Sequence, residues 1–164
     1  MAVNGKQKGN NYERNIANLL SDRFKDYTNI EKSFRRNPDS GAFFGGTNVN
    51  RMEVYDTDYA VYGDLICPRN FKFSVECKHY KSPPSFASIM LQKVTAWDDW
   101  LKKARQDASS ANKQMILVIR YNGVKDVAFL EAGMLDKTPI ISYNNAYGYL
   151  LSTVLEEDDS FFFE

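Results

Sequence analysis

The sequence predicts an α/β domain in which helices flank a central mixed β-sheet. Two long segments carry apolar residues at helical spacing, and several short apolar runs have the length of β-strands. These segments follow one another in the order helix, strands, helix, strands. A chain of 164 residues, 43% of them hydrophobic, is long enough to fold around its own core without a disulfide or a structural metal.

In the first half of the chain we expect one helix and three strands. The helix spans residues 10–24, where asparagines can cap its start and apolar residues recur every three or four positions. A short strand is expected at residues 30–36, followed by turn residues over 37–41. Two further strands, residues 59–67 and 71–80, are joined by a short Pro-Arg-Asn connection.

In the second half we expect a long helix and then more strands. The helix begins at Ser85 and carries an unbroken apolar stripe over residues 90–108. Residues 115–121 form an apolar run typical of a central, buried strand. An Asn-Gly dipeptide then makes a strong hairpin turn, so residues 124–130 should pair with that strand. Weaker strand or helix patterns follow at residues 140–143 and 147–155.

Charged residues are distributed unevenly along the chain. We expect a single domain over residues 1–155 and an acidic, aromatic tail over residues 156–164. Lys and Arg balance Asp and Glu at 21 each, yet residues 1–51 hold nine basic and five acidic side chains, and the tail holds five acids and no base. The basic body favours a polyanionic partner, although such a charge is also common in domains that bind no nucleic acid. By composition the tail resembles the partner-recruiting tails of single-strand-binding proteins, but its phenylalanines could instead pack a terminal strand onto the sheet.

The sequence also indicates a compartment. No apolar run approaches the ~20 residues of a membrane span, and the first residues lack the apolar segment of a signal peptide. Cys67 and Cys77 are too few for a disulfide scaffold, and we interpret them as reduced thiols. We therefore expect a cytoplasmic protein that does not associate with a membrane.

Asp64, Glu76 and Lys78 are the residues that indicate chemistry. Side chains alternate between faces along a strand, so Glu76 and Lys78 project side by side, and Asp64 on the preceding strand can lie next to Glu76. One interpretation is a cross-strand salt bridge on a solvated face. The strand is rich in Phe, Val and Cys, however, and burying carboxylates there is costly unless a metal or a partner compensates. Hard oxygen ligands with an ammonium group suit Mg²⁺-assisted phosphodiester hydrolysis.

Four short segments carry a resemblance to a known family. Residues 63–64 (Gly-Asp) and 75–78 (Val-Glu-Cys-Lys) are similar to the PD-(D/E)xK nuclease signature, with Tyr-Gly in place of the proline. Residues 8–14 (Lys-Gly-Asn-Asn-Tyr-Glu-Arg) and 34–41 (Phe-Arg-Arg-Asn-Pro-Asp-Ser-Gly) resemble the opening helix and the arginine-bearing strand of archaeal-type Holliday-junction resolvases and their phage relatives. The resemblance covers residues 8–80 and fades afterwards.

The resemblance implies a restriction-endonuclease-like core and a function. It implies a metal-dependent, structure-selective DNA endonuclease that resolves Holliday junctions by paired phosphodiester hydrolysis, in a prokaryotic or phage-infected cell. A four-way junction needs two symmetric cuts, which a homodimer can supply. The expected cofactor is Mg²⁺, with Mn²⁺ able to substitute.

The resemblance also assigns two further site residues. It implies that Glu13 is an additional acid at the metal site, although an acid in a first helical turn can simply complement the helix dipole. It implies that Ser40 reaches the scissile phosphate, although Ser40 can also be only a turn residue.

Basic residues near the start of the chain are expected to contact DNA. Arg35 and Arg36 are candidate phosphate contacts, and because strand neighbours point to opposite faces only one of them should face the DNA. The further candidates for backbone contacts are Lys6, Lys8 and Arg14. The alternatives are a repair or restriction-type nuclease of the same fold that acts on duplex DNA, or a non-catalytic DNA-binding replication-accessory protein. An intact Asp64, Glu76 and Lys78 set favours an enzyme, because a binding module has no need of desolvated carboxylates.

Overall fold

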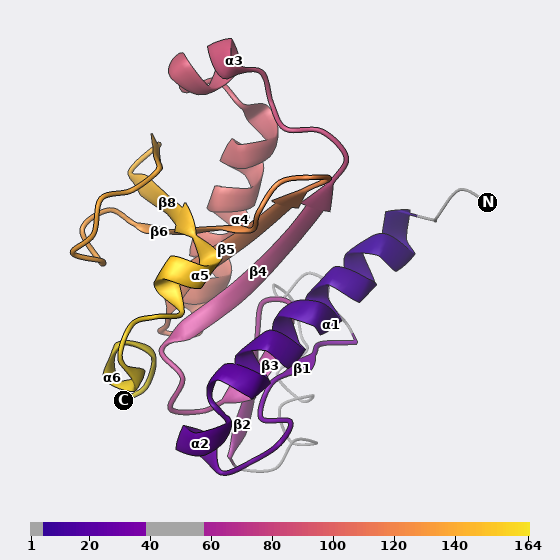
Figure 1. Ribbon diagram of the computed structural model, residues 1–164, viewed down its shortest axis with the longest axis vertical. Coiled ribbons are helices and arrows are strands. Elements are labelled where there is room, and N and C mark those ends of the chain that lie inside the picture. Colours follow the sequence, from indigo (N-terminus) through magenta and orange to yellow (C-terminus); the bar gives the residue numbers. More distant parts are fainter. Residues whose placement is uncertain (1–4, 39–57) are drawn as a thin grey trace.

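A mixed β-sheet with helices on both faces forms the centre of the computed structural model, which describes residues 5–38 and 58–164 (Figure 1). The strand order is β4-β5-β6-β8-β7, in which β4 pairs parallel with β5 and the other neighbours pair antiparallel. The predicted α/β class and mixed sheet are therefore confirmed. The strands are β4 (Phe73–Tyr80), β5 (Gln114–Tyr121), β6 (Val127–Glu131), β7 (Ile141–Tyr143) and β8 (Ala146–Leu150).

A small antiparallel sheet lies beside β4 and consists of β1 (Arg35–Arg36), β3 (Leu65–Pro68) and β2 (Tyr59–Tyr62) in that order. The single strand expected over 59–67 is wrong, because the chain reverses at Gly63 and forms a hairpin. Gly63 has a φ of 65°, and a Cβ there would lie 2.5 Å from the Val75 carbonyl oxygen, so this turn requires glycine. The strand expected over 30–36 is reduced to two residues.

Helices cover both faces of the main sheet. α1 (Gly5–Arg23) packs on one face and shares a core with Val75 and Cys77 of β4. α4 (Thr95–Ser110) packs on the other face against Leu117 and Ile119 of β5. The shorter helices are α2 (Lys25–Thr28), α3 (Phe86–Met90), α5 (Leu151–Val154) and α6 (Asp159–Phe162). Among the helices of residues 5–38 and 58–164, none is long and apolar enough to cross a membrane.

The long helix expected from Ser85 is two helices, α3 and α4, with a break between them. Gln92 lies in the break with a φ of 54°, in the left-handed region. Its side-chain amide donates to the Ser142 carbonyl oxygen at 3.1 Å, and its Oε1 accepts from the Asn144 N–H at 2.8 Å. These bonds to the β7–β8 turn hold the chain in the break, and Met90, expected in the apolar stripe, is exposed.

The last residues of the chain pack into the core. Phe162 and Phe163 are buried, and their ring centres lie 4.8 and 5.0 Å from that of Phe24. Lys72 donates its backbone N–H to the Phe162 carbonyl oxygen at 2.7 Å, and Phe163 forms an antiparallel bridge with Phe71. The phenylalanines of residues 156–164 therefore pack onto the core, but they do so from the short helix α6 and one isolated bridge and not from the terminal strand that was one of the two interpretations.

Candidate functional site

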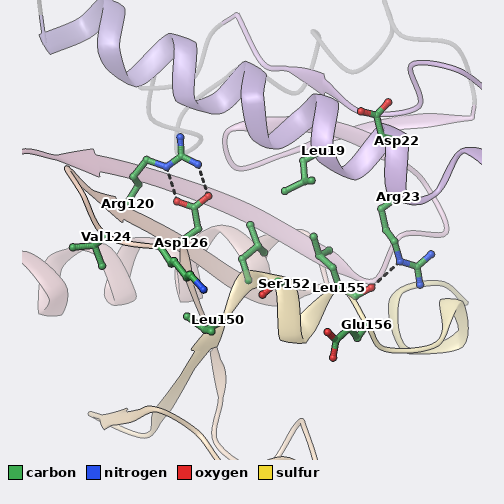
Figure 2. Close-up of a pocket in the computed structure, with 12 residues that line it drawn as sticks. Leu19, Asp22, Arg23, Arg120, Val124, Asp126, Leu150, Ser152, Leu155 and Glu156 are labelled. Atoms are coloured by element: carbon green, nitrogen blue, oxygen red, sulfur yellow. Dashed lines mark hydrogen bonds and ion pairs between the residues drawn. The ribbon is translucent and has the colours of Figure 1, made fainter.

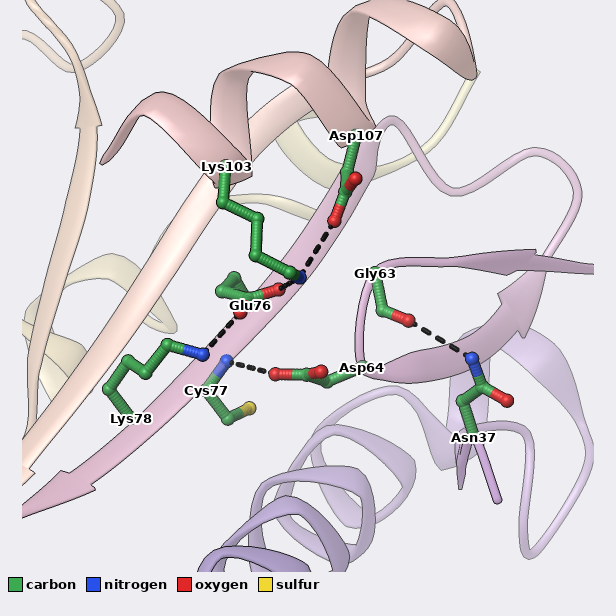
Figure 3. Close-up of polar contacts among 8 residues, drawn as sticks. All are labelled: Asn37, Gly63, Asp64, Glu76, Cys77, Lys78, Lys103 and Asp107. Atoms are coloured by element: carbon green, nitrogen blue, oxygen red, sulfur yellow. Dashed lines mark hydrogen bonds and ion pairs between the residues drawn. The ribbon is translucent and has the colours of Figure 1, made fainter. Parts of the chain in front are cut away.

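Asp64 forms hydrogen bonds with backbone groups along the edge of β4 that does not pair with β5. Its backbone N–H donates to the Val75 carbonyl oxygen at 2.8 Å. Its Oδ2 accepts from the Cys77 N–H, also at 2.8 Å (Figure 3). Strand edges present unpaired backbone groups, and Asp64 satisfies two of those on β4. Asn37 fixes the turn from its other side, since its N–H donates to the Asp64 carbonyl oxygen at 2.9 Å and its side-chain amide to the Gly63 carbonyl oxygen at 3.2 Å.

The carboxyl group of Asp64 is buried close to a second carboxylate. Burial, and after it the nearby Glu76 carboxylate, raise the pKa of Asp64 to about 7, although Lys78 opposes the shift. Desolvation and a like charge act in the same direction here. A buried acid whose pKa lies near neutrality is typical of functional sites.

Glu76 is buried between two lysines from different elements (Figure 3). Only 1% of Glu76 is exposed. Its Oε1 accepts from the Lys78 ammonium, and its Oε2 accepts from the Lys103 ammonium on α4 at 2.6 Å. Lys103 also donates to Asp107, one helical turn further on, at 2.9 Å. The charge of Glu76 is therefore compensated by two cations, as a buried carboxylate requires.

The two lysines are held in their charged form. Burial acts to lower the pKa of Lys78, but the carboxylates of Glu76 and Asp64 outweigh it and raise the pKa above its usual value. The pKa of Lys103 is raised in the same way, against the effect of its burial. A lysine that keeps its proton serves to stabilise negative charge rather than to accept a proton.

Glu13 lies on the buried side of α1 and is paired with Arg36. Its Oε2 accepts from the Arg36 guanidinium at 2.7 Å, and the same guanidinium donates to Asn10 Oδ1 at 2.8 Å. Burial raises the pKa of the Cys77 thiol, and the charges of Asp64, Glu76 and Glu13 raise it further. The three acids expected at the site, Asp64, Glu76 and Glu13, are thus all close enough to Cys77 to raise the pKa of its thiol. Within residues 5–38 and 58–164, however, no group of three or more acidic, His or Cys side chains is close enough together to hold one metal ion.

Residues 4–153 match a family model described as "Phage putative PDDEXK endonuclease". The chain belongs to this family. The family is one of nucleases, and the mixed sheet flanked by helices is compatible with their restriction-endonuclease-like fold. Searches of curated proteins and of solved structures gave no match.

PDDEXK nucleases generally use divalent metal ions, and the donors of this PDDEXK chain suit such an ion. Asp64 and Glu76 offer hard carboxylate oxygens, the ligands that Mg²⁺ and related ions prefer. In the described part of the chain, Oδ1 of Asp64 has no hydrogen-bond partner. A dication between the two carboxylates would also relieve the repulsion that raises the pKa of Asp64. Asp64 would hold it through Oδ1, and Glu76 would hold it by exchanging a lysine ammonium for the ion.

The remaining expected residues of this PDDEXK chain are spread around the site. Ser40 lies outside the described residues. Lys8 donates to Asn122 Oδ1 at 2.9 Å and lies near the C-terminal ends of β4 and β5, while Arg14 donates to Asn11 at 3.0 Å. Lys6 is exposed at the start of α1. Arg35 is exposed, and its guanidinium lies 5.5 Å from the centre of the Tyr59 ring.

Lys103 and Asn37 were not anticipated from the sequence. The only signal at Lys103 is an acid four residues later, and such pairs are common on solvated helices. Asn37 was interpreted only as a turn residue. Both depend on contacts with segments 26 or 27 residues away along the chain, which no local pattern reveals.

A separate pocket of about 690 Å³ lies between α1 and the segment from β8 to α5 (Figure 2). It shares no lining residue with the Asp64–Glu76 site. Arg120 and Asp126 form an ion pair at one end, with Nε 2.6 Å from Oδ1. At the other end Arg23 donates to the Leu155 carbonyl oxygen at 2.7 Å. Arg120, Asp126 and Arg23 are therefore engaged within the chain.

Proposed function

We propose that the chain is a Mg²⁺-dependent DNA endonuclease whose centre is formed by Asp64, Glu76 and Lys78. The observation that carries the proposal is the burial of two neighbouring carboxylates, Asp64 in the turn between β2 and β3 with its pKa raised to about 7, and Glu76 on β4 held by Lys78. A structural salt bridge has no need of the second carboxylate. Mn²⁺ is expected to replace Mg²⁺, and Ca²⁺ to support binding without cutting.

Each residue has a distinct part in the proposed reaction. When bound, a divalent ion supplies Lewis-acid polarisation of the scissile phosphate and of a water molecule. Asp64 and Glu76 would hold the ion through their oxygens. Lys78, still protonated, orients the attacking water and stabilises the negative charge that develops on the phosphate. Lys103 and Asp107 position the Glu76 carboxylate from α4, and Glu13 orients Arg36 on the far side of β4.

For the substrate we propose branched DNA, with the four-way junction as the specific case, cut by a homodimer. Three features support this substrate. The segments around Lys8, Arg14 and Arg35 resemble those of junction resolvases, residues 1–155 are basic, and a two-fold dimer would present two sites for two symmetric cuts. Lys6, Lys8, Arg14 and Arg35 are proposed to contact the DNA backbone.

The test is cleavage of labelled four-way junction, flap and linear duplex DNA, with Mg²⁺, Ca²⁺ or excess chelator. Asp64→Asn and Glu76→Gln should each slow cutting by ~10²-fold or more, about 3 kcal/mol of lost transition-state stabilisation. Asp99→Asn, at an exposed position of α4, is the matched control and should cut like the unaltered protein. Melting curves on the same preparations separate a chemical role from a folding role.

Two results would contradict the proposal. Full cleavage in excess chelator would show that the reaction needs no metal ion. Retained cleavage by Asp64→Asn would show that Asp64 is not part of the catalytic site. Binding of DNA by the unaltered protein without any cutting, over all metals tested, would favour the non-catalytic DNA-binding alternative.

A further inference from the structure

An exposed apolar surface lies on and just after α3. Phe86, Met90 and Leu91 are 77%, 65% and 66% exposed, more than any other large apolar side chain in the described residues. We call these three residues the α3 patch. Exposed apolar side chains gathered in one short segment are typical of a binding surface.

The segment that carries the α3 patch is fixed to the rest of the fold. Ser85 caps the start of α3 by accepting from the Ser88 N–H at 3.1 Å, and Ile89 packs against the core beneath α4. After the patch, Gln92 is bonded to the β7–β8 turn, and the Val94 N–H donates to the Tyr143 hydroxyl at 2.7 Å. The three side chains are therefore displayed by an anchored segment, and their exposure is not a consequence of a frayed end.

The charges around the α3 patch favour a polyanion. Lys81 and Lys93 flank the patch along the chain, and no Asp or Glu lies between them. Asp98, the next acid, accepts from the Tyr143 hydroxyl and the Asn144 amide. A two-fold contact with a second copy would bring these lysines toward their own equivalents, which opposes association. An anionic polymer would instead be attracted to the same surface.

The patch also lies at the end of the molecule where β4 ends. Lys78 and Tyr80 are on the last residues of β4, and the chain passes from there directly to α3, which projects beyond the sheet (Figure 1). Tyr80 is exposed, and its ring centre lies 4.7 Å from that of Trp100 at the near end of α4. DNA held at Lys78 would therefore extend toward the α3 patch.

We propose that the α3 patch packs against unstacked bases of DNA, as they occur at a branch point or a single-stranded gap. The inference rests on the proposed function in one respect, that the polymer held at the Asp64 site is DNA. An intact duplex presents phosphates and groove edges, to which a phenylalanine adds little. Where stacking is interrupted, the faces of the bases become available to apolar wedges and aromatic rings. The α3 patch thus discriminates branched from linear DNA without reading sequence.

The test measures the affinity for a labelled four-way junction and for a linear duplex with the sequence of one arm, with Ca²⁺ in place of Mg²⁺. The variant is Phe86→Ser with Leu91→Ser, and the control is Leu19→Ser, which alters a 40% exposed apolar residue on α1. We expect the double variant to bind the junction about tenfold more weakly and the duplex unchanged. A 2-aminopurine at the branch point should report less unstacking with the double variant than with the unaltered protein.

Several outcomes would overturn the inference. They are an unchanged junction affinity, an equal loss for junction and duplex, or no binding of the junction by the unaltered protein. A change from dimer to monomer in sedimentation, with the junction affinity intact, would assign the patch to a second copy instead. Cleavage of linear duplex in Mg²⁺ tests the Asp64 site separately. If the unaltered protein binds the junction through the patch but cuts no DNA, the endonuclease proposal fails and this inference stands.

Discussion

The two halves of β4 bury side chains of opposite character. At its start Phe73 joins an aromatic cluster with Phe71 and Phe162, each about 1% exposed. Three residues further on, Glu76 is equally buried, yet it is surrounded by lysines and a second carboxylate. Burial of the aromatic rings stabilises the fold, whereas burial of the acids costs stability that other charges must offset. The first half of the strand thus anchors the structure, and the second half holds groups suited to chemistry.

The largest expected effect lies in the aromatic half. Phe162→Ala should lower the free energy of unfolding by about 3–5 kcal/mol, because it removes a fully buried ring and leaves a cavity between Phe24 and Phe71. Urea denaturation measures the change. Phe161→Ala is the control, since that ring is only partly buried and should cost less. At temperatures where the Phe162 variant remains folded, its cleavage rate should match that of the unaltered protein. A loss below about 1 kcal/mol would show that the C-terminal residues do not anchor β4.

A second prediction concerns the charged half and pH. The folded state raises the pKa of Asp64 to about 7, from an unfolded value of about 3.9. Between these values the folded state binds the proton more tightly, so this contribution to stability is complete below pH 4 and is lost as the pH rises toward 7. The slope is at most about 1.4 kcal/mol per pH unit.

Comparison with Asp64→Asn isolates this contribution. Without metal, the asparagine variant should be increasingly more stable than the unaltered protein as the pH rises from 4 to 7, since its amide oxygen can still accept from the Cys77 N–H. Mg²⁺ should reduce the difference. Parallel stability curves for the two proteins would show that the Asp64 carboxyl is not strained by its surroundings.

The sequence predicts the charged half of β4 well because the relevant rule is local. Alternation along a strand places Glu76 and Lys78 on one face, and their neighbours Val75 and Cys77 on the opposite face. The central strand at residues 115–121 was equally predictable, because an uninterrupted apolar run leaves few alternatives to burial. The expected helix at residues 10–24 begins earlier in the structure, at Gly5, where the residues are polar and carry no periodic signal.

What the sequence does not reveal depends on distant contacts. Gln92 breaks the long helix only because the β7–β8 turn provides partners for its amide. Residues 59–67 are strand-forming on either side of Gly63-Asp64, a dipeptide typical of turns, and the close approach of Gly63 to Val75 fixes the reversal there. Lys103 reaches Glu76 across the space between α4 and β4. In each case a long-range contact overrides or adds to a local pattern.

The third prediction tests whether Lys103 positions Glu76. Lys103→Met removes one of the two cations on the Glu76 carboxylate and should slow cleavage about tenfold at saturating Mg²⁺, about 1.4 kcal/mol. Lys102→Met, the same change at the exposed neighbouring position, is the control. The Mg²⁺ concentration for half-maximal rate should not rise, because the removed ammonium competes with the metal for Glu76. A rise in that concentration with an unchanged maximal rate would indicate that Lys103 assists metal binding instead.

The smallest expected effects concern two adjacent arginines, one with a part-buried charge and one with an exposed charge. Arg36 is paired with Glu13 beneath the surface, whereas Arg35 is exposed on the other side of β1. Each phosphate contact that is lost lowers the slope of log affinity against log salt by about one. Arg35→Ala should therefore lower that slope by about one for every DNA sequence, and it should leave the melting temperature unchanged.

Arg36→Ala should do the opposite. It leaves the Glu13 carboxylate buried without its guanidinium partner, so it should lower the melting temperature and leave the salt slope of DNA binding nearly unchanged. Measuring both quantities on both variants decides the assignment, because a solvated phosphate contact and a buried ion pair respond to different perturbations. A reduced slope for Arg36→Ala, with normal stability, would mean that Arg36 exchanges Glu13 for a phosphate when DNA binds. Glu13 would then be released next to Cys77 and the other two carboxylates, which would bring it closer to the metal-ligand role that the family resemblance implies.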